Sequence, residues 1–325
     1  MRLLSRTALA CTALLAVSCS TQKSFKMALL PDTQTYACDY PEIFHAQTRW
    51  LAEHRKEIAF VLHLGDITNN NSEKQWEVAA AAMNRLDGKV PYVLTVGNHD
   101  LGEKGRTGTR DSRLFNRYFP YEKYSLDKHF GGAFEPGKME NVWYTFRAGR
   151  TDWLVLSLEF GPRDKVLEWA GEVIRSHPDK NVIIDTHAYL YSDDTRMQKG
   201  HRWLPQHYGA GKNATGGEAA NNGEQMWQKL IAKYPNIVFV FSGHVLNDGT
   251  GLLVSEGAGG NRVCQILSNY QRGVNVSKNG GDGFLRIVSV DTAAGTVSVQ
   301  SYSPYTNTYK TEPDHQFTVK GLKFR

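Results

Sequence analysis

The chain has 325 residues, of which 41% are hydrophobic and 22% are charged. This length and composition suit one large folded unit or two small ones, and they exclude short disulfide scaffolds, collagen-like repeats and disordered chains. The formal net charge of +5, from 38 basic and 33 acidic residues, is too weak to indicate a nucleic-acid-binding surface.

The first residues have the pattern of an export signal. Arg2 and Arg6 supply a positive start, and the apolar stretch over 8–17 that follows is too short to remain as a membrane-spanning helix. The next residues, Ser18-Cys19, resemble a bacterial lipoprotein cleavage site with Cys19 as the lipid anchor. Ordinary signal cleavage is the alternative. We therefore expect an exported protein, either a cell-envelope lipoprotein or a periplasmic or secreted one.

These boundaries predict a signal peptide over 1–18, a short tether over 19–24 and a folded domain over 25–325. Removal of the signal takes away two arginines and no acid, which leaves a net charge of +3. Two cysteines then remain besides Cys19. Because disulfides persist in exported proteins, a bridge between Cys38 and Cys264 and a pair of separate thiols are both open alternatives.

Strand and helix patterns alternate along the first part of the domain. Continuous apolar runs predict buried strands, and apolar residues at helical spacing predict the helices between them. Ser72 and Gln75 have the spacing of a capping box at a helix start. The strands are expected over 25–30, 59–64 and 90–96, and the helices over 41–57 and from Ser72 onward.

The second part of the chain continues this alternation after an irregular excursion over 101–140. We expect a hairpin with strands over 142–146 and 153–158, a helix over 164–176, a strand over 182–184, a loop over 188–222, a helix over 224–234, and strands over 237–241, 262–267, 284–290 and 296–302. The sequence contains no internal repeat or proline-rich linker, which favours a single domain.

Five of the predicted strands are each followed by a side chain that can bind a metal: Asp32, Asp66, Asn98, His187 and His244. In α/β sheets, ligands bind beyond the carboxyl ends of the strands, so these distant residues are expected to converge. Carboxylate, amide and imidazole ligands suit zinc, manganese or iron. A glycine stands directly before three of the five, where a sharp turn out of a strand favours a residue without Cβ.

These motifs resemble those of the calcineurin-like metallophosphoesterases. The family pattern of Asp-x-His, Gly-Asp, Gly-Asn-His-Asp, a lone His and Gly-His-x-His corresponds here to Asp32-Thr33-Gln34, Gly65-Asp66, Gly97-Asn98-His99-Asp100, His187 and Gly243-His244-Val245-Leu246. The resemblance implies an α/β fold with two mixed sheets flanked by helices. It also implies a hydrolase with two divalent metal ions. Three further segments resemble those of a secreted bacterial branch of the family: His244–Gly251, Ser268–Gln271 and Gly280–Gly283.

By this resemblance, Asp66 bridges the two ions, and Asn98, His187 and His244 complete the second site. Two departures affect the first site, because Gln34 and Leu246 replace histidines. Asp32, Asp66 and Gln34 would then form an oxygen-rich site. Such a site should bind its ion more weakly, or favour manganese or magnesium.

The resemblance also implies a function. A metal-activated water would attack a phosphate monoester or diester, His99 would protonate the leaving group or stabilise the transition state, and Asp100 would orient His99. The substrate is expected to be a small-molecule or envelope phosphate ester. An alternative from another class is a binding module of the same fold that has lost activity with the two histidines. A nucleic-acid-binding protein is a third, which the small charge disfavours.

Overall fold

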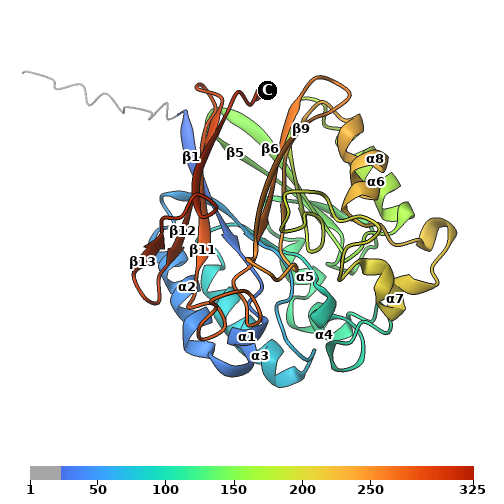
Figure 1. Cartoon of the computed structure of the whole chain (residues 1–325), viewed down its shortest axis with the longest axis vertical. Coiled ribbons are helices and arrows are strands. Elements are labelled where there is room, and N and C mark those ends of the chain that lie inside the picture. Colours follow the sequence, from blue (N-terminus) through green and yellow to red (C-terminus); the bar gives the residue numbers. More distant parts are fainter. Residues whose placement is uncertain (1–22) are drawn as a thin grey trace, which may run out of the picture.

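The computed structural model describes residues 23–325, and it contains two mixed β-sheets with helices around them (Figure 1). The predicted signal peptide and Cys19 lie outside the described residues. Within 23–325, no helix has the length and apolar character that crossing a membrane requires.

The first sheet has the strand order β13-β12-β11-β1-β2-β3, with β14 also paired to β12. Its core is parallel: β1 pairs with β2 and β2 with β3, whereas β11 runs antiparallel to β1. Its strands are β1 (Ser24–Leu30), β2 (Ile58–His63), β3 (Tyr92–Leu94), β11 (Leu285–Asp291), β12 (Thr296–Ser303), β13 (Thr308–Lys310) and β14 (Gln316–Lys320).

The second sheet has the order β4-β5-β6-β7-β8-β10-β9, with β6, β7, β8 and β10 parallel. Its strands are β4 (Phe130–Ala133), β5 (Val142–Ala148), β6 (Thr151–Leu158), β7 (Asn181–Thr186), β8 (Ile237–Ser242), β9 (Thr250–Glu256) and β10 (Arg262–Ser268). The predicted hairpin is β5–β6, which turns through Gly149 and Arg150, both with positive φ.

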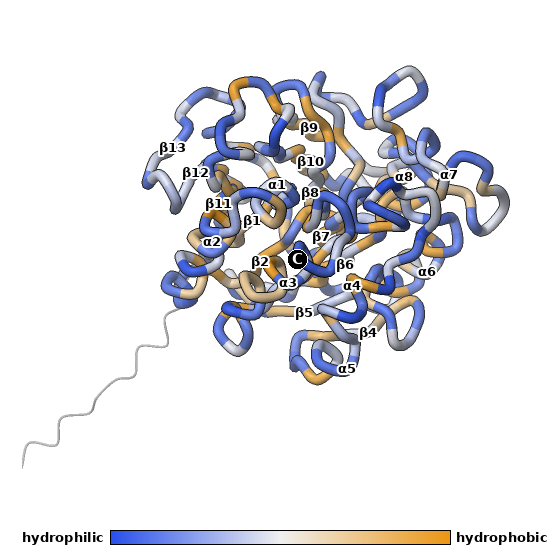
Figure 2. The backbone as a smooth tube through the Cα atoms, turned by 90° about the horizontal axis from the view of Figure 1, so that it is seen from below, coloured by the Kyte–Doolittle hydropathy of each residue, from blue (hydrophilic) through white to orange (hydrophobic). Residues whose placement is uncertain are grey.

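Apolar side chains fill the space between the two sheets. Phe60 of the first sheet stacks on Phe146 of the second with ring centroids 5.0 Å apart, and Phe25 meets Trp153 edge-on at 5.2 Å. The hydroxyls of Thr95 and Ser157 hydrogen bond at 2.7 Å between the two layers. One core of buried residues therefore includes both sheets, and Figure 2 shows hydrophobic strand segments near the centre with hydrophilic loops around them.

Helices flank the sheets, as predicted (Figure 1). They are α1 (Gln34–Asp39), α2 (Pro41–Glu53), α3 (Glu73–Met83), α4 (Arg113–Tyr118), α5 (Tyr121–Tyr124), α6 (Asp164–Arg175), α7 (Gly209–Lys212) and α8 (Gly223–Lys229). The excursion over 101–140 is less irregular than expected, because it contains α4, α5 and β4. Of the two remaining cysteines, Cys38 is half-buried, Cys264 is buried, and both are free thiols.

The predicted capping box at Ser72 is wrong. The Ser72 side chain makes no capping hydrogen bond, and the Gln75 side-chain oxygen instead accepts from the backbone N–H groups of Asn69 (2.9 Å) and Asn70 (2.8 Å). Gln75 therefore braces the loop that follows Asp66. A capping box does occur at α8, where Asn222 and Gln225 satisfy each other's backbone N–H groups, and this cap fixes the helix start at Gly223.

Candidate metal centre

The register of the parallel strands brings the predicted metal ligands together. Leu30 pairs with His63 and His63 with Leu94, so the loops that carry Asp32, Asp66 and Asn98 leave one sheet side by side. In the second sheet, Asp185 pairs with Phe241, so His187 and His244 also follow neighbouring strands. All five side chains are at most 5% exposed.

The loops from the two sheets approach so closely that a Cβ would not fit between them. A Cβ added to Gly243 would lie 2.1 Å from Asp32 Oδ1, and one added to Gly65 would lie 2.6 Å from His187 Nδ1. Gly65 also has φ +94°, whereas Gly97 and Gly243 do not have positive φ. Close backbone approach, more than turn conformation, therefore explains glycine at these positions.

Two of the ligand residues have the left-handed backbone conformation that favours glycine. Asp66 has φ 49° and His244 has φ 74°. A residue with a side chain is uncommon in this region, and such strain clusters at functional sites where the surrounding structure enforces it. Here the strain turns both side chains toward the same point.

Four potential ligand atoms converge at that point. His187 Nε2 lies 3.2 Å from Asp66 Oδ1, 3.2 Å from Asn98 Oδ1 and 3.2 Å from His244 Nδ1. Ligand atoms that share an ion at about 2.1 Å are roughly 3.0 to 3.4 Å apart. The donor set and its spacing therefore fit a divalent cation, and Asp66, His187 and His244 form the metal-compatible cluster of the described residues.

Backbone carbonyls set the tautomers of the two imidazoles. Leu64 O lies 2.7 Å from His187 Nδ1, and Trp203 O lies 2.8 Å from His244 Nε2, so both of these nitrogens carry the proton that they donate. The other nitrogens, His187 Nε2 and His244 Nδ1, then face each other with their lone pairs. Two lone pairs and a carboxylate this close together repel one another, so a positive charge must lie between them.

The electrostatics of the cluster agree with this requirement. Burial lowers the pKa of His187, but the charges of Asp66 and Asp32 outweigh this effect and raise it to about 9. Burial lowers the pKa of His244 to about 3. Burial also raises the pKa of Asp32 to about 7. The metal-free cluster thus takes up a proton at His187, and a bound cation would replace it.

Apolar and aromatic groups enclose the second-site residues. The ring of Phe160 lies 5.8 Å from that of His187 and 5.3 Å from that of His244, and the Tyr208 ring lies 6.1 Å from His244. Trp203 and Tyr208 belong to the long loop over 188–222. Sequence patterns gave no signal for these contacts, because neither a hydrogen bond to a backbone carbonyl nor packing against an aromatic ring requires a sequence motif.

His99 lies at the edge of the cluster. Its backbone N–H donates to Asp66 Oδ1 at 2.8 Å, and its half-buried ring contacts Asn69 O through Nδ1 at 2.7 Å. The expectation that Asp100 orients this ring is wrong. The Asp100 carboxylate instead accepts from the backbone N–H groups of Ile67, Thr68 and Gly97, because it is buried behind the loop rather than beside the imidazole.

Two of the predicted first-site residues, Asp32 and Gln34, are linked through Gln271. Asp32 accepts from the backbone N–H of His244, and Gln34 is buried at the start of α1 with its side-chain oxygen lacking any hydrogen-bond partner. Asn269 and Gln271, which the sequence did not mark as site residues, donate to Asp32 Oδ2 at 3.1 and 2.7 Å. The Leu246 side chain does not replace a ligand, and it approaches the backbone at Gly273.

The sequence model of the calcineurin-like phosphoesterases matches residues 25–248. The chain belongs to this family. The match covers all of the strand-end residues from Asp32 to His244, and the family is one of metal-dependent phosphoric ester hydrolases.

The chain has moderate to low sequence identity to the following proteins. The chain is 30% identical over 284 residues to the uncharacterized protein YvnB of Bacillus subtilis (strain 168), and the match covers 85% of this chain but only 20% of that protein. A purple acid phosphatase from yellow lupin seeds has a TM-score of 0.55 at 14% identity, and the match covers 92% of this chain and 54% of that one. GAP50 of Plasmodium has a TM-score of 0.47 at 13% identity, with 93% and 89% covered.

The close contact at Gly97 provides a test of the geometry of this candidate metal centre. A Cβ at Gly97 would lie 2.1 Å from Asp66 N and 2.2 Å from Asp66 Oδ1, so Gly97→Ala must displace the Asp66 loop. We expect the free energy of unfolding to fall by about 1 to 3 kcal/mol. We also expect weaker Mn²⁺ binding, measured by urea denaturation and calorimetry.

Gly108→Ala is the matched control, because a Cβ there meets no atom within 4 Å and its φ is not positive. This variant should keep the stability and Mn²⁺ affinity of the parent chain. Equal behaviour of the two variants would contradict the close packing of Gly97 against Asp66.

Proposed function

We propose that this protein is an exported phosphoesterase that hydrolyses phosphate monoesters or diesters at a centre of two divalent metal ions. The observation that carries the proposal is the convergence of two imidazole lone pairs, the Asp66 carboxylate and the Asn98 amide oxygen at spacings of 3.2 Å. Membership of the phosphoesterase family supplies the reaction class.

The residues divide between two positions. Asp66, Asn98, His187 and His244 would hold the second ion, and Asp32 and Gln34 would hold the first, with Asp66 shared. Bound ions of this kind lower the pKa of a water to about 7 and neutralise phosphoryl charge. The unpartnered, buried oxygen of Gln34 supports a first-site cation, since an unsatisfied buried acceptor costs about 1 to 3 kcal/mol.

His99 is the residue of this chain that is suited to move a proton. Asn69 O fixes Nδ1 as the donor, so Nε2 is the nitrogen left to serve a substrate. The 2.8 Å hydrogen bond from the His99 backbone N–H to Asp66 Oδ1 holds His99 beside this proposed ligand. His99 can therefore protonate the departing oxygen, while Asp100 holds the loop in place behind it.

The activity itself is testable with purified protein. We expect Mn²⁺-, Zn²⁺- or Mg²⁺-dependent hydrolysis of p-nitrophenyl phosphate or of its bis ester, and His99→Ala should lower kcat by about 10²- to 10⁴-fold. His129→Ala is the control, because His129 bonds to Thr145 O and lines a cavity with the first residues of β1. Its kcat should be unchanged.

The outcomes separate the competing functions. Metal binding without turnover of either ester would favour the silent binding module over the enzyme. Full activity of His99→Ala on both esters would remove His99 from the proposed mechanism and leave the metal site in place.

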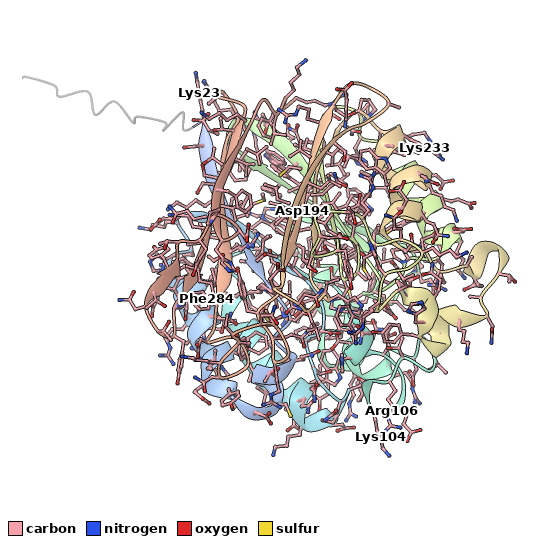
Figure 3. The ribbon with its side chains drawn as sticks, viewed as in Figure 1. Lys23, Lys104, Arg106, Asp194, Lys233 and Phe284 are labelled. Carbon is pink, nitrogen blue, oxygen red and sulfur yellow. The ribbon has the colours of Figure 1, made fainter. Side chains whose placement is uncertain are left out.

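The arrangement of the chain is compatible with a membrane anchor at Cys19 that lies away from the candidate metal centre. The described chain begins at Lys23, at the opposite end of the molecule from Lys104 and Arg106, which lie in the loop just after His99 (Figure 3). Only three residues separate Cys19 from Lys23, so a lipid on Cys19 would lie near that end. A cell-envelope location therefore leaves the site accessible.

The proposed lipid anchor can be tested by expression in a bacterium that processes lipoproteins. The mature protein should carry acyl chains on Cys19 by mass spectrometry and stay in the membrane fraction, and Cys19→Ala should release it from that fraction. An unmodified N-terminus in a soluble periplasmic or secreted protein would instead support ordinary signal cleavage.

A further inference from the structure

Three buried amide side chains form one hydrogen-bond network with Asp32: those of Gln34, Asn269 and Gln271. Gln271 contacts two of the expected first-site ligands, Asp32 and Gln34. Its Nε2 donates to Asp32 Oδ2 at 2.7 Å, and its Oε1 accepts from Gln34 Nε2. Asn269 Nδ2 also donates to Asp32 Oδ2, at 3.1 Å. Asp32 Oδ2 is thus saturated by amide donors.

The charge of Asp32 fixes the orientation of both glutamines. The Asp32 carboxylate only accepts hydrogen bonds when ionised, so Gln271 must present its NH₂ group to it. Gln271 Oε1 then faces Gln34, and Gln34 must present its own NH₂ group in return. This leaves Gln34 Oε1 as a buried acceptor without a partner, which is what the structure has.

Besides Gln34 Oε1, the other oxygen that remains available to a cation is Asp32 Oδ1. It accepts one long hydrogen bond, of 3.3 Å, from His244 N, whereas Oδ2 accepts a 3.1 Å bond from the same group as well as the two amide bonds. The amide network therefore occupies Asp32 Oδ2, and it leaves Asp32 Oδ1 with one long hydrogen bond and Gln34 Oε1 with none. Both available atoms are hard oxygen donors.

The loop after β10 is built to hold these amides in place. Asn269 Oδ1 accepts from Gln271 N at 3.0 Å, and Asn269 Nδ2 also donates to Val245 O at 3.2 Å. Gly249 and Gly281 pack closely against this loop, where an added Cβ would lie 2.1 Å from Asn269 O and 2.5 Å from Tyr270 O. The segments Ser268–Gln271 and Gly280–Gly283 therefore pack against each other.

We propose that Gln271, held by Asn269, is the positioning residue of the first metal site. Gln271 orients Asp32 and Gln34 by hydrogen bonds, as outer hydrogen-bond partners orient metal ligands in general. This orientation compensates for the two histidines that Gln34 and Leu246 replace. The resulting oxygen-donor site selects Mn²⁺ or Mg²⁺ over Zn²⁺. This inference rests on the proposed two-metal function.

The test measures how many Mn²⁺ ions the purified protein binds across a range of free Mn²⁺ concentrations, by equilibrium dialysis with elemental analysis. The parent should bind two ions. Gln271→Met, which keeps the side-chain volume nearly constant, should lower the affinity of one ion by about 10- to 100-fold and leave the other unchanged. Competing Zn²⁺ should displace the ion of the second site before that of the first.

Gln265→Met is the matched control. Gln265 is also buried, on β10, and its amide bonds to Tyr189, Leu253 and Ser255 rather than to site residues. This variant should bind two ions with the parent's affinities. A thermal melt without metal establishes whether each variant is folded.

A second variant keeps the test decisive if Gln271→Met does not fold. Gln34→Met removes the free oxygen and leaves the bond between Gln271 and Asp32 intact, so it should cause the same selective loss of one ion. In the double variant, the loss should be smaller than the product of the two single losses, because Gln271 acts partly through Gln34.

Parent-like binding of both ions by Gln271→Met or Gln34→Met would overturn the inference, as would an equal loss in Gln265→Met. A parent chain that binds one ion and still hydrolyses esters would also overturn it, while the metal-dependent activity would stand. Absence of both ion binding and hydrolysis in the parent would mean that the proposed function itself had failed.

Discussion

The site depends on two imidazole nitrogens that face each other closely enough to share one positive charge, either a proton or a cation. His187 Nε2 and His244 Nδ1 are 3.2 Å apart because the carbonyls of Leu64 and Trp203 hold the proton on the far side of each ring. Lone pairs at this distance repel unless a positive charge is shared. The surrounding strain, burial and close glycine contacts all serve to keep the rings in this arrangement.

The two sheets contribute to this interaction in different ways. The first supplies oxygen ligands from the ends of β1, β2 and β3, and the second supplies nitrogen ligands from the ends of β7 and β8. The shared core fixes one sheet against the other, so the ligands depend on packing far from the site. The proposed first metal position has no imidazole, and amides from the loop after β10 bond to its Asp32, so the two proposed positions would differ in ligand chemistry.

Much of this arrangement was predictable from the sequence. Apolar runs located most strands within one or two residues of their ends, and the polar residues that follow them identified Asp32, Asp66, Asn98, His187 and His244. Periodicity could reveal these features because burial of a strand on both faces leaves a local signature. The two-sheet fold came from the family resemblance, since strand patterns alone do not determine which strands pair.

Other parts of the site were not predictable. The roles of Gln75, Asn269 and Gln271 depend on contacts between segments far apart in the chain, and a buried amide has the same sequence appearance wherever it bonds. The Trp203 carbonyl carries no sequence signal at all. Asp100 was assigned to the wrong partner, because adjacency to His99 in sequence does not indicate which way a carboxylate turns in a tight loop.

The most direct measurement is anomalous X-ray diffraction from crystals of the protein loaded with one equivalent of Mn²⁺ or Zn²⁺. The account predicts an anomalous peak about 2.0 to 2.2 Å from both His187 Nε2 and His244 Nδ1, with Asp66 and Asn98 completing the ligand set. A peak elsewhere, an ion bound through His187 Nδ1, or no peak in crystals with an unaltered cluster would contradict it.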